Sequence, residues 1–262
     1  MKLNGKVGLV TGAGTGVGAA TAVLLAQKGC RVVVNYRRSD EEAAEVVTAI
    51  EETGGEAFAF QADVASDNET RALVDATVEE FGRLDLLVNN AGTTEFIPFD
   101  DLDAVGDDVW QRLHQVNVVG AFHCARAAAK AMRETGGEDG AEIVNVGSIA
   151  GLKATGSCIP YAASKAALHN LTVALARTLA TDRIRVNAVA PGFITGRWLE
   201  EGLAERYERT KVAFEKAMPL GAVCTPNEVA TAILSLLEGS DLVTGQILAC
   251  DAGMSLAEPV QV

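Results

Sequence analysis

The sequence predicts an α/β fold, a doubly wound sheet of seven parallel strands with helices on both faces. Short runs rich in Val, Leu and Ile alternate with segments of helical period, which is typical of buried parallel strands joined by crossover helices. A glycine-rich turn at residues 11–18 follows the first apolar run. No repeat, low-complexity tract or Pro/Ser-rich linker interrupts the alternation. Because such crossovers are right-handed, we expect one sheet and one domain over residues 1–262.

The elements follow in order from this alternation. The expected strands are Lys6–Thr11, Arg31–Asn35, Glu56–Gln61, Asp85–Asn89, Glu142–Val146, Arg185–Ala190 and Gln246–Ala249. The connecting segment 39–55 shows the helix signals, with Ser39 or Asp40 at the N-cap, early carboxylates and a double-glycine end. The least regular stretches, 93–109 and 193–219, follow strand carboxyl ends. Ligands bind at that edge of an open sheet, so we expect 193–219 to form a substrate loop.

Composition excludes several classes of protein. The chain has 262 residues, of which 48% are hydrophobic, and its net charge is −13, which disfavours nucleic acid and anionic membranes as partners. No apolar run of about 18 residues and no export signal are present, so we expect a cytoplasmic protein. Its five cysteines are scattered without a CxxC pair. They therefore predict reduced thiols and no metal site.

The stretch "TGAGTGVG" at residues 11–18 predicts a phosphate-binding turn. Glycines let the backbone approach a ligand closely, and the following helix offers unpaired N–H groups with partial positive charge. A plain tight turn is the alternative. A triphosphatase loop is excluded, because Ala19 and Ala20 stand where lysine and Ser/Thr would be.

Several motifs together resemble one family. The spacing of Thr11, Gly12, Gly16 and Gly18 is accompanied by "ADV" at 62–64, "NNAG" at 89–92, "YAASK" at 161–165 and "PG" at 191–192. From Lys6 to Gly253 the chain resembles the short-chain dehydrogenase/reductase family, with members such as 3-oxoacyl-[acyl-carrier-protein] reductases and glucose dehydrogenases. The resemblance implies a Rossmann fold and hydride transfer between a nicotinamide cofactor and a carbonyl/alcohol pair.

The resemblance also implies four catalytic residues, Asn117, Ser148, Tyr161 and Lys165. Tyr161 would exchange a proton with the substrate oxygen, Ser148 would hydrogen-bond that oxygen, and Asn117 would support a water that links Lys165 to solvent. Tyr161 and Lys165 are four residues apart and so share one helix face. From this spacing we expect the ammonium to lower the pKa of the phenol toward the range useful for proton transfer.

The implied cofactor contacts come from the ends of successive strands. They are Gly12, Thr15, Gly16, Val17, Gly18, Tyr36, Arg37, Arg38, Asp63, Val64, Asn90, Ala91, Gly92, Tyr161, Lys165, Pro191, Gly192 and Ile194. By resemblance, Asp63 would contact the adenine, Lys165 the nicotinamide ribose, and the turn from Pro191 to Ile194 the nicotinamide.

The end of the second strand indicates which nicotinamide cofactor binds. NAD-selective folds carry an acidic residue there, whereas Asn35 and Tyr36 are followed by Arg37 and Arg38, which suit a phosphate. We therefore expect NADP(H), with Arg37 at the 2′-phosphate and NAD(H) as the alternative. The chain departs from many NADP-dependent relatives at Thr15, where they carry a basic residue. A second departure is Gly196, where relatives often carry threonine.

The function expected is an NADP(H)-dependent oxidoreductase acting on a small-molecule carbonyl or alcohol. The alternative is a dinucleotide-binding sensor that has lost catalysis. A serine hydrolase is excluded because Ser148 lies outside a GxSxG elbow and the three histidines are expected to be surface or packing residues. The substrate stays open between acyl-carrier, sugar or polyol, and steroid or xenobiotic compounds. Apolar helices near 108–134 and 158–181 predict a homotetramer or homodimer.

Overall fold

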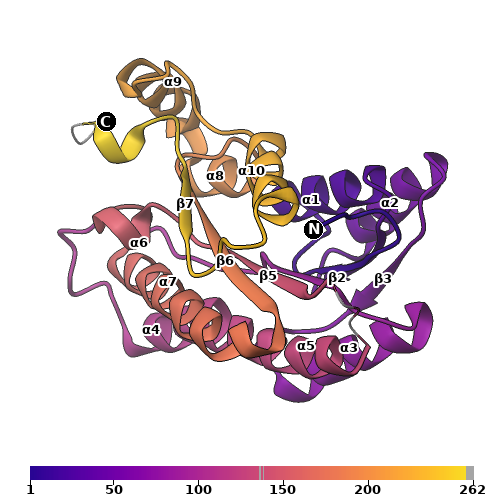
Figure 1. Cartoon of the computed structure of the whole chain (residues 1–262). Coiled ribbons are helices and arrows are strands. Elements are labelled where there is room, and N and C mark those ends of the chain that lie inside the picture. The colour runs from indigo at the N-terminus through magenta and orange to yellow at the C-terminus, as the bar shows by residue number, and fades with distance from the viewer. Residues whose placement is uncertain (136, 138, 258–262) are drawn as a thin grey trace.

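Seven parallel strands form one sheet in the order β3-β2-β1-β4-β5-β6-β7 (Figure 1). The structure, a computed structural model, describes residues 1–135, 137 and 139–257. The strands are Val7–Val10 (β1), Arg31–Tyr36 (β2), Ala57–Gln61 (β3), Leu86–Asn89 (β4), Ala141–Val146 (β5), Ile184–Pro191 (β6) and Ile247–Cys250 (β7). Each end lies within one residue of its predicted position, which confirms the expected sheet.

Helices cover both faces of this sheet (Figure 1). One layer contains α1 (Gly16–Gln27), α2 (Asp40–Glu52) and α10 (Pro226–Glu238). The other contains α3 (Asp67–Phe81), α4 (Asp107–His114), a π-helix (Gln115–Gly120), α5 (Ala121–Thr135), α6 (Ala150–Lys153) and α7 (Ile159–Leu179). Helices α8 (Arg197–Leu203) and α9 (Tyr207–Ala217) lie beyond the sheet, and short 3-10 turns occupy Ala180–Asp182, Ala204–Arg206 and Met254–Leu256.

The alternation of side chains along each strand divides the core between the two layers. On β1 and β2, Val10 and Val32 pack with Leu25 and Ile233 under α1, α2 and α10. Their neighbours Leu9 and Val33 pack toward the other layer, with Met132 of α5. Apolar side chains on both faces are why these strands are continuous hydrophobic runs.

The carboxyl ends of all seven strands meet at one edge, where the chain reverses direction across the sheet between β1 and β4. Such a switch point opens a crevice beyond the strand ends. The segment 193–219, expected to be irregular, is largely helical in α8 and α9. Its apolar side chains form their own small core around Phe193, Tyr207 and Val223, which stabilises these helices.

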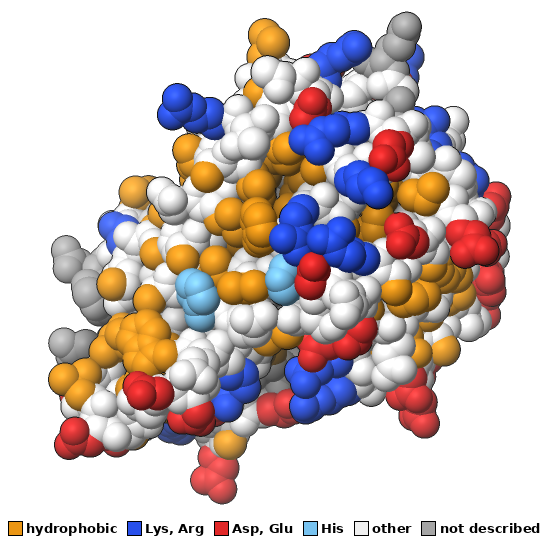
Figure 2. Space-filling view, turned by 90° about the horizontal axis from the view of Figure 1, so that it is seen from below, with side chains coloured by type: hydrophobic (Ala, Val, Ile, Leu, Met, Phe, Trp, Pro, Cys, Tyr) orange, Lys and Arg blue, Asp and Glu red, His pale blue; other side chains and the backbone are white. Residues whose placement is uncertain are grey.

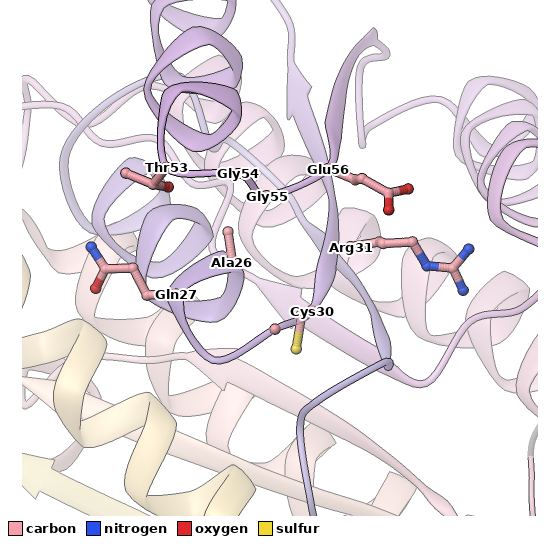
Figure 3. A pocket seen from close by; sticks show the side chains of 9 residues that line it. Ala26, Gln27, Cys30, Arg31, Thr53, Gly54, Gly55 and Glu56 are labelled. Carbon is pink, nitrogen blue, oxygen red and sulfur yellow. The ribbon is translucent and has the colours of Figure 1, made fainter.

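A separate hollow of about 340 Å³ lies at the amino ends of the strands, opposite the crevice (Figure 3). It lies where α1 and α2 end and β2 and β3 begin, lined by residues such as Gln27, Arg31, Thr53 and Glu56. All five cysteines are free, and four of them are buried, as expected for reduced thiols. Among the described residues no helix has the length and apolarity to cross a membrane.

Candidate active site

The glycine turn between β1 and α1 is shaped by close backbone approaches. Gly12 and Gly16 have φ of 60° and 56°, in the left-handed region that favours glycine. A Cβ on Gly18 would overlap the carbonyl oxygen of Gly12 and the side chain of Asn90. Thr15 is the N-cap of α1, yet its side chain makes no capping hydrogen bond. The helix N-terminus therefore has amide donors and partial positive charge to offer, which fits the diphosphate of a dinucleotide.

The turn is held from the neighbouring strand β4 by "NNAG". The Asn90 side chain donates to the carbonyl oxygens of Thr11 and Gly12, both at 2.9 Å. In return the Thr11 hydroxyl accepts from the backbone N–H groups of Asn90 and Ala91, both at 3.0 Å. These contacts explain why Asn90 and Ala91 belong beside the glycines: they fix the turn before any ligand binds.

Asn35 has a role that the sequence did not reveal. Its Oδ1 accepts from the Gly12 N–H at 3.2 Å, and its Nδ2 donates to the carbonyl oxygens of Phe60 and Ala62 at 3.2 and 3.1 Å. The buried amide thus joins the ends of β1, β2 and β3. An amide is needed because one side chain must both accept and donate.

Beyond Asn35, the two arginines stand at the crevice. Arg37 is half exposed and its Nε lies 2.8 Å from Asp63 Oδ2. The residue expected to bind the 2′-phosphate is therefore paired with the residue expected to contact the adenine. Arg38 is exposed, Tyr36 is half-buried, and Val64 is buried in the core beneath α5.

Asn117 lies in the π-helix, an irregular turn of the kind that often marks functional sites. Its Oδ1 accepts from the Thr93 N–H at 2.8 Å, and its Nδ2 donates to the Thr93 carbonyl at 3.0 Å and to the Ser164 hydroxyl at 2.9 Å. The side-chain amide is therefore occupied by protein partners. Through it, the segment after β4 is attached to α7, beside Gly92 and Lys165.

Tyr161 and Lys165 share the inner face of α7, as their spacing predicts. The Lys165 ammonium lies 5.7 Å from the centre of the Tyr161 ring and donates to the Val146 carbonyl at 2.8 Å. Burial raises the pKa of Tyr161 to about 12, although a hydrogen bond with the Ser148 hydroxyl opposes the rise. Burial also lowers the pKa of Lys165 to about 8. The expected lowering of the phenol pKa by Lys165 is therefore wrong for the protein alone, because burial raises this pKa and the opposing contact comes from Ser148.

His169 continues the same face one turn further, although the sequence predicted for it only a surface or packing role. It is buried, and its Nε2 accepts a hydrogen bond from the Ser148 N–H at 3.4 Å. A Cβ on Gly147 would overlap the imidazole, so a glycine is needed there. Burial, reinforced by Lys165, lowers the pKa of His169 to about 4. The spacing of Tyr161, Lys165 and His169, each four residues apart, was the available signal.

The turn after β6 lies at the same end of the sheet as the glycine turn. The Pro191 carbonyl accepts from the Ile149 N–H at 3.0 Å, and the Gly192 N–H donates to the Cys250 carbonyl at 3.1 Å. Ile194 pairs with Cys224 in an isolated bridge. Gly196 is the N-cap of α8 and has φ of 121°, a backbone conformation that favours glycine over the threonine expected from the resemblance.

Most of the residues implied by the resemblance therefore lie near the carboxyl ends of the strands. The family model described as short chain dehydrogenase matches residues 6–206. The chain belongs to the short-chain dehydrogenase family. As a short-chain dehydrogenase it is an NAD(P)-dependent oxidoreductase that acts on a carbonyl or an alcohol.

Three relatives illustrate the range within the short-chain dehydrogenases. A 3-oxoacyl-[acyl-carrier-protein] reductase of Synechocystis sp. is 37% identical over 96% of this chain and 98% of the relative. A 3β-hydroxysteroid dehydrogenase 1 of Eggerthella lenta is 39% identical over 97% and 95%. A solved short-chain type dehydrogenase/reductase from Mycobacterium ulcerans is 27% identical, covers 100% of this chain and 94% of its own, and superposes with a TM-score of 0.90.

Proposed function

We propose that this chain interconverts a ketone and a secondary alcohol with NADP(H), and that Tyr161 moves the proton. The observation that carries the proposal is the cluster of Tyr161, Ser148 and the buried Lys165 at the same end of the sheet as the glycine turn. When bound, the nicotinamide supplies or accepts the hydride. The protein residues orient the substrate oxygen and exchange its proton.

In this proposal the neutral phenol is the working form for reduction. A raised pKa keeps the proton on Tyr161 near neutral pH, so the phenol is ready to donate to a carbonyl oxygen. Ser148 hydrogen-bonds the phenol and would stabilise the developing charge on the substrate oxygen. Asn117 would act through its main chain on any water near Lys165, because Thr93 and Ser164 occupy its side chain.

Changing Tyr161→Phe tests this role. The variant lacks the hydroxyl that gives the proton, so we expect turnover to fall by at least about 1000-fold while the cofactor affinity changes less than about threefold. Ketone reduction followed by nicotinamide absorbance, with cofactor titration on the same sample, checks both values. Wild-type turnover in this variant would exclude Tyr161 as the acid, and no turnover by the wild type on any ketone would favour a catalytically silent sensor.

The preference for NADP(H) over NAD(H) is supported by the end of β2. Asn35 is committed to hydrogen bonds between strand ends, and the residues that follow it in the sequence are Tyr36 and the half-exposed Arg37 rather than a carboxylate. A charge-assisted contact to the 2′-phosphate is worth about 1.5–3 kcal/mol, roughly 10- to 150-fold in affinity. We expect Arg37→Ala to weaken the binding of NADPH by about that factor and the binding of NADH by much less. Equal affinities for both cofactors in both proteins would remove the assignment.

We also propose a homodimer or homotetramer assembled through α4, α5 and α7. Figure 2 shows apolar side chains gathered on the face seen from below in Figure 1, where these helices lie, interspersed with Lys and Arg. Trp110 of α4, Phe122 of α5 and Val173 of α7 are 41%, 38% and 46% exposed. Large apolar side chains exposed together on neighbouring helices support a subunit contact.

A further inference from the structure

Trp198 lies beside Tyr161, and its indole ring is partly exposed. Its indole lies 6.4 Å from the Tyr161 ring, centre to centre, at an interplanar angle of 72°. Trp198 is 46% exposed. A large aromatic surface that the protein leaves uncovered beside a proton donor is available to a ligand.

The protein holds this indole in place from several sides. A Cβ on Gly202, one turn along α8, would overlap the ring of Phe96, so the helix packs directly on the segment after β4. Leu199 and Leu203 join the small core around Phe193 and Tyr207. Arg197, the residue before the tryptophan, pairs with Glu42 of α2 at 2.7 Å. The ring is therefore positioned before a substrate arrives.

The surroundings of Tyr161 on the other side are apolar as well. The phenol ring packs with Ile97 against Val109, Leu113 and Cys158. The arginines of α4 and α8 are already paired with carboxylates. Arg112 pairs with Glu95, and Arg197 pairs with Glu42 and Glu201. A charged substrate group near Tyr161 would lose its water and meet paired charges, which is costly.

We infer that Trp198 forms one wall of the substrate subsite, and that the substrate is an uncharged cyclic ketone or secondary alcohol whose ring packs on the indole. The inference rests on the proposed function, because it takes the carbonyl or hydroxyl oxygen of the substrate as lying at the Tyr161 hydroxyl. The ring that contains the carbonyl carbon would then extend over the neighbouring indole. A short acyclic ketone is too small to cover the indole, and an anionic one gains no free cation from Arg112 or Arg197.

Kinetics on the full chain give the first test. The probes are 2-decalone as the ring ketone, 2-butanone as the small ketone and acetoacetate as the anion, each with NADPH. Burying about half of an indole is worth roughly 10- to 50-fold in affinity. We expect Trp198→Ala to raise the KM for 2-decalone by about that factor, with a smaller effect on kcat. Trp198→Phe should restore much of the loss, and the kcat/KM for 2-butanone should change less than threefold in both variants.

Fluorescence gives a readout independent of turnover. In Trp110→Phe the only tryptophan left is Trp198, so its emission reports the subsite directly. With NADP⁺ saturating, we expect 2-decalone to change this emission saturably, and 2-butanone and acetoacetate at the same concentrations to leave it unchanged. The same titration on Trp110→Phe with Tyr161→Phe measures binding without chemistry.

The two proposals fail in different ways. The proposed subsite is wrong, and the proposed reaction stands, if 2-decalone is reduced while the emission of Trp198 stays constant. The same holds if Trp198→Ala lowers kcat/KM equally for all three probes. If 2-decalone binds against Trp198 but no ketone or alcohol is turned over with either cofactor, the proposed reaction is wrong and the subsite stands.

Discussion

At the scale of single residues, the inner face of α7 decides what the site does. Tyr161, Lys165 and His169 lie on successive turns, and burial shifts the pKa of each toward its neutral form. His169 is neutral and accepts at Nε2, so its proton is on Nδ1, a buried atom without a hydrogen-bond partner among the described residues. The imidazole therefore supports the backbone of Ser148 only while it stays uncharged.

This arrangement predicts how acid affects stability. The pKa of His169 lies near 4 in the folded protein and near 6.5 in the unfolded chain, so the unfolded state binds the extra proton between these values. Its contribution, on the order of 3 kcal/mol in total, is present above about pH 6.5 and is lost progressively down to about pH 4. Urea unfolding at several pH values should show a shallower acid limb for His169→Asn than for the wild type. Parallel limbs would contradict the buried neutral imidazole.

At the scale of elements, the glycine turn depends on how closely β1, α1 and the segment after β4 approach. In Gly18→Ala the new methyl group meets the backbone of Gly12 and the Asn90 amide, which cannot both move. Overpacking of this kind costs about 1–3 kcal/mol of stability, so we expect a lower melting temperature. We also expect a weaker cofactor affinity, because the turn must shift away from its binding conformation. Gly106→Ala is the control, because its Cβ would meet only the flexible carboxylate of Asp108. Wild-type cofactor affinity in Gly18→Ala would show that the turn is looser than its geometry implies.

The elements also show what could be predicted from the sequence and what could not. Strand positions followed from apolar runs, because a strand buried on both faces leaves a strong local signal. Helices α8 and α9 were not predicted, since their stability depends on a core with Phe193 and Val223 that forms only in the folded chain. The hydrogen bonds made by the side chains of Asn35 and Asn117 were not predicted either, because their partners lie far away in the sequence. His169 left only the four-residue spacing from Lys165 as a signal. The pairing of Arg37 with Asp63 was equally hidden, because the two residues come from different strands.

At the scale of the whole molecule, the exposed faces of α4, α5 and α7 predict the assembly. We expect the wild type to sediment at two or four times 27.3 kDa, and Val173→Glu to dissociate it by burying a charge in the contact. Leu242→Glu is the matched control, because Leu242 is 94% exposed and lies outside these helices. A wild type that sediments only at 27.3 kDa would contradict the proposed contact.

The amide of Asn35 has a practical consequence for protein engineering. Aspartate is the obvious replacement for anyone wishing to redesign the coenzyme preference, since a carboxylate at the end of the second strand suits a ribose diol. In this molecule that exchange would set an anion against the carbonyl oxygens of Phe60 and Ala62, which now receive hydrogen bonds. Redesign should therefore begin at Arg37, where a new side chain faces solvent and none of the hydrogen bonds between the strand ends is lost.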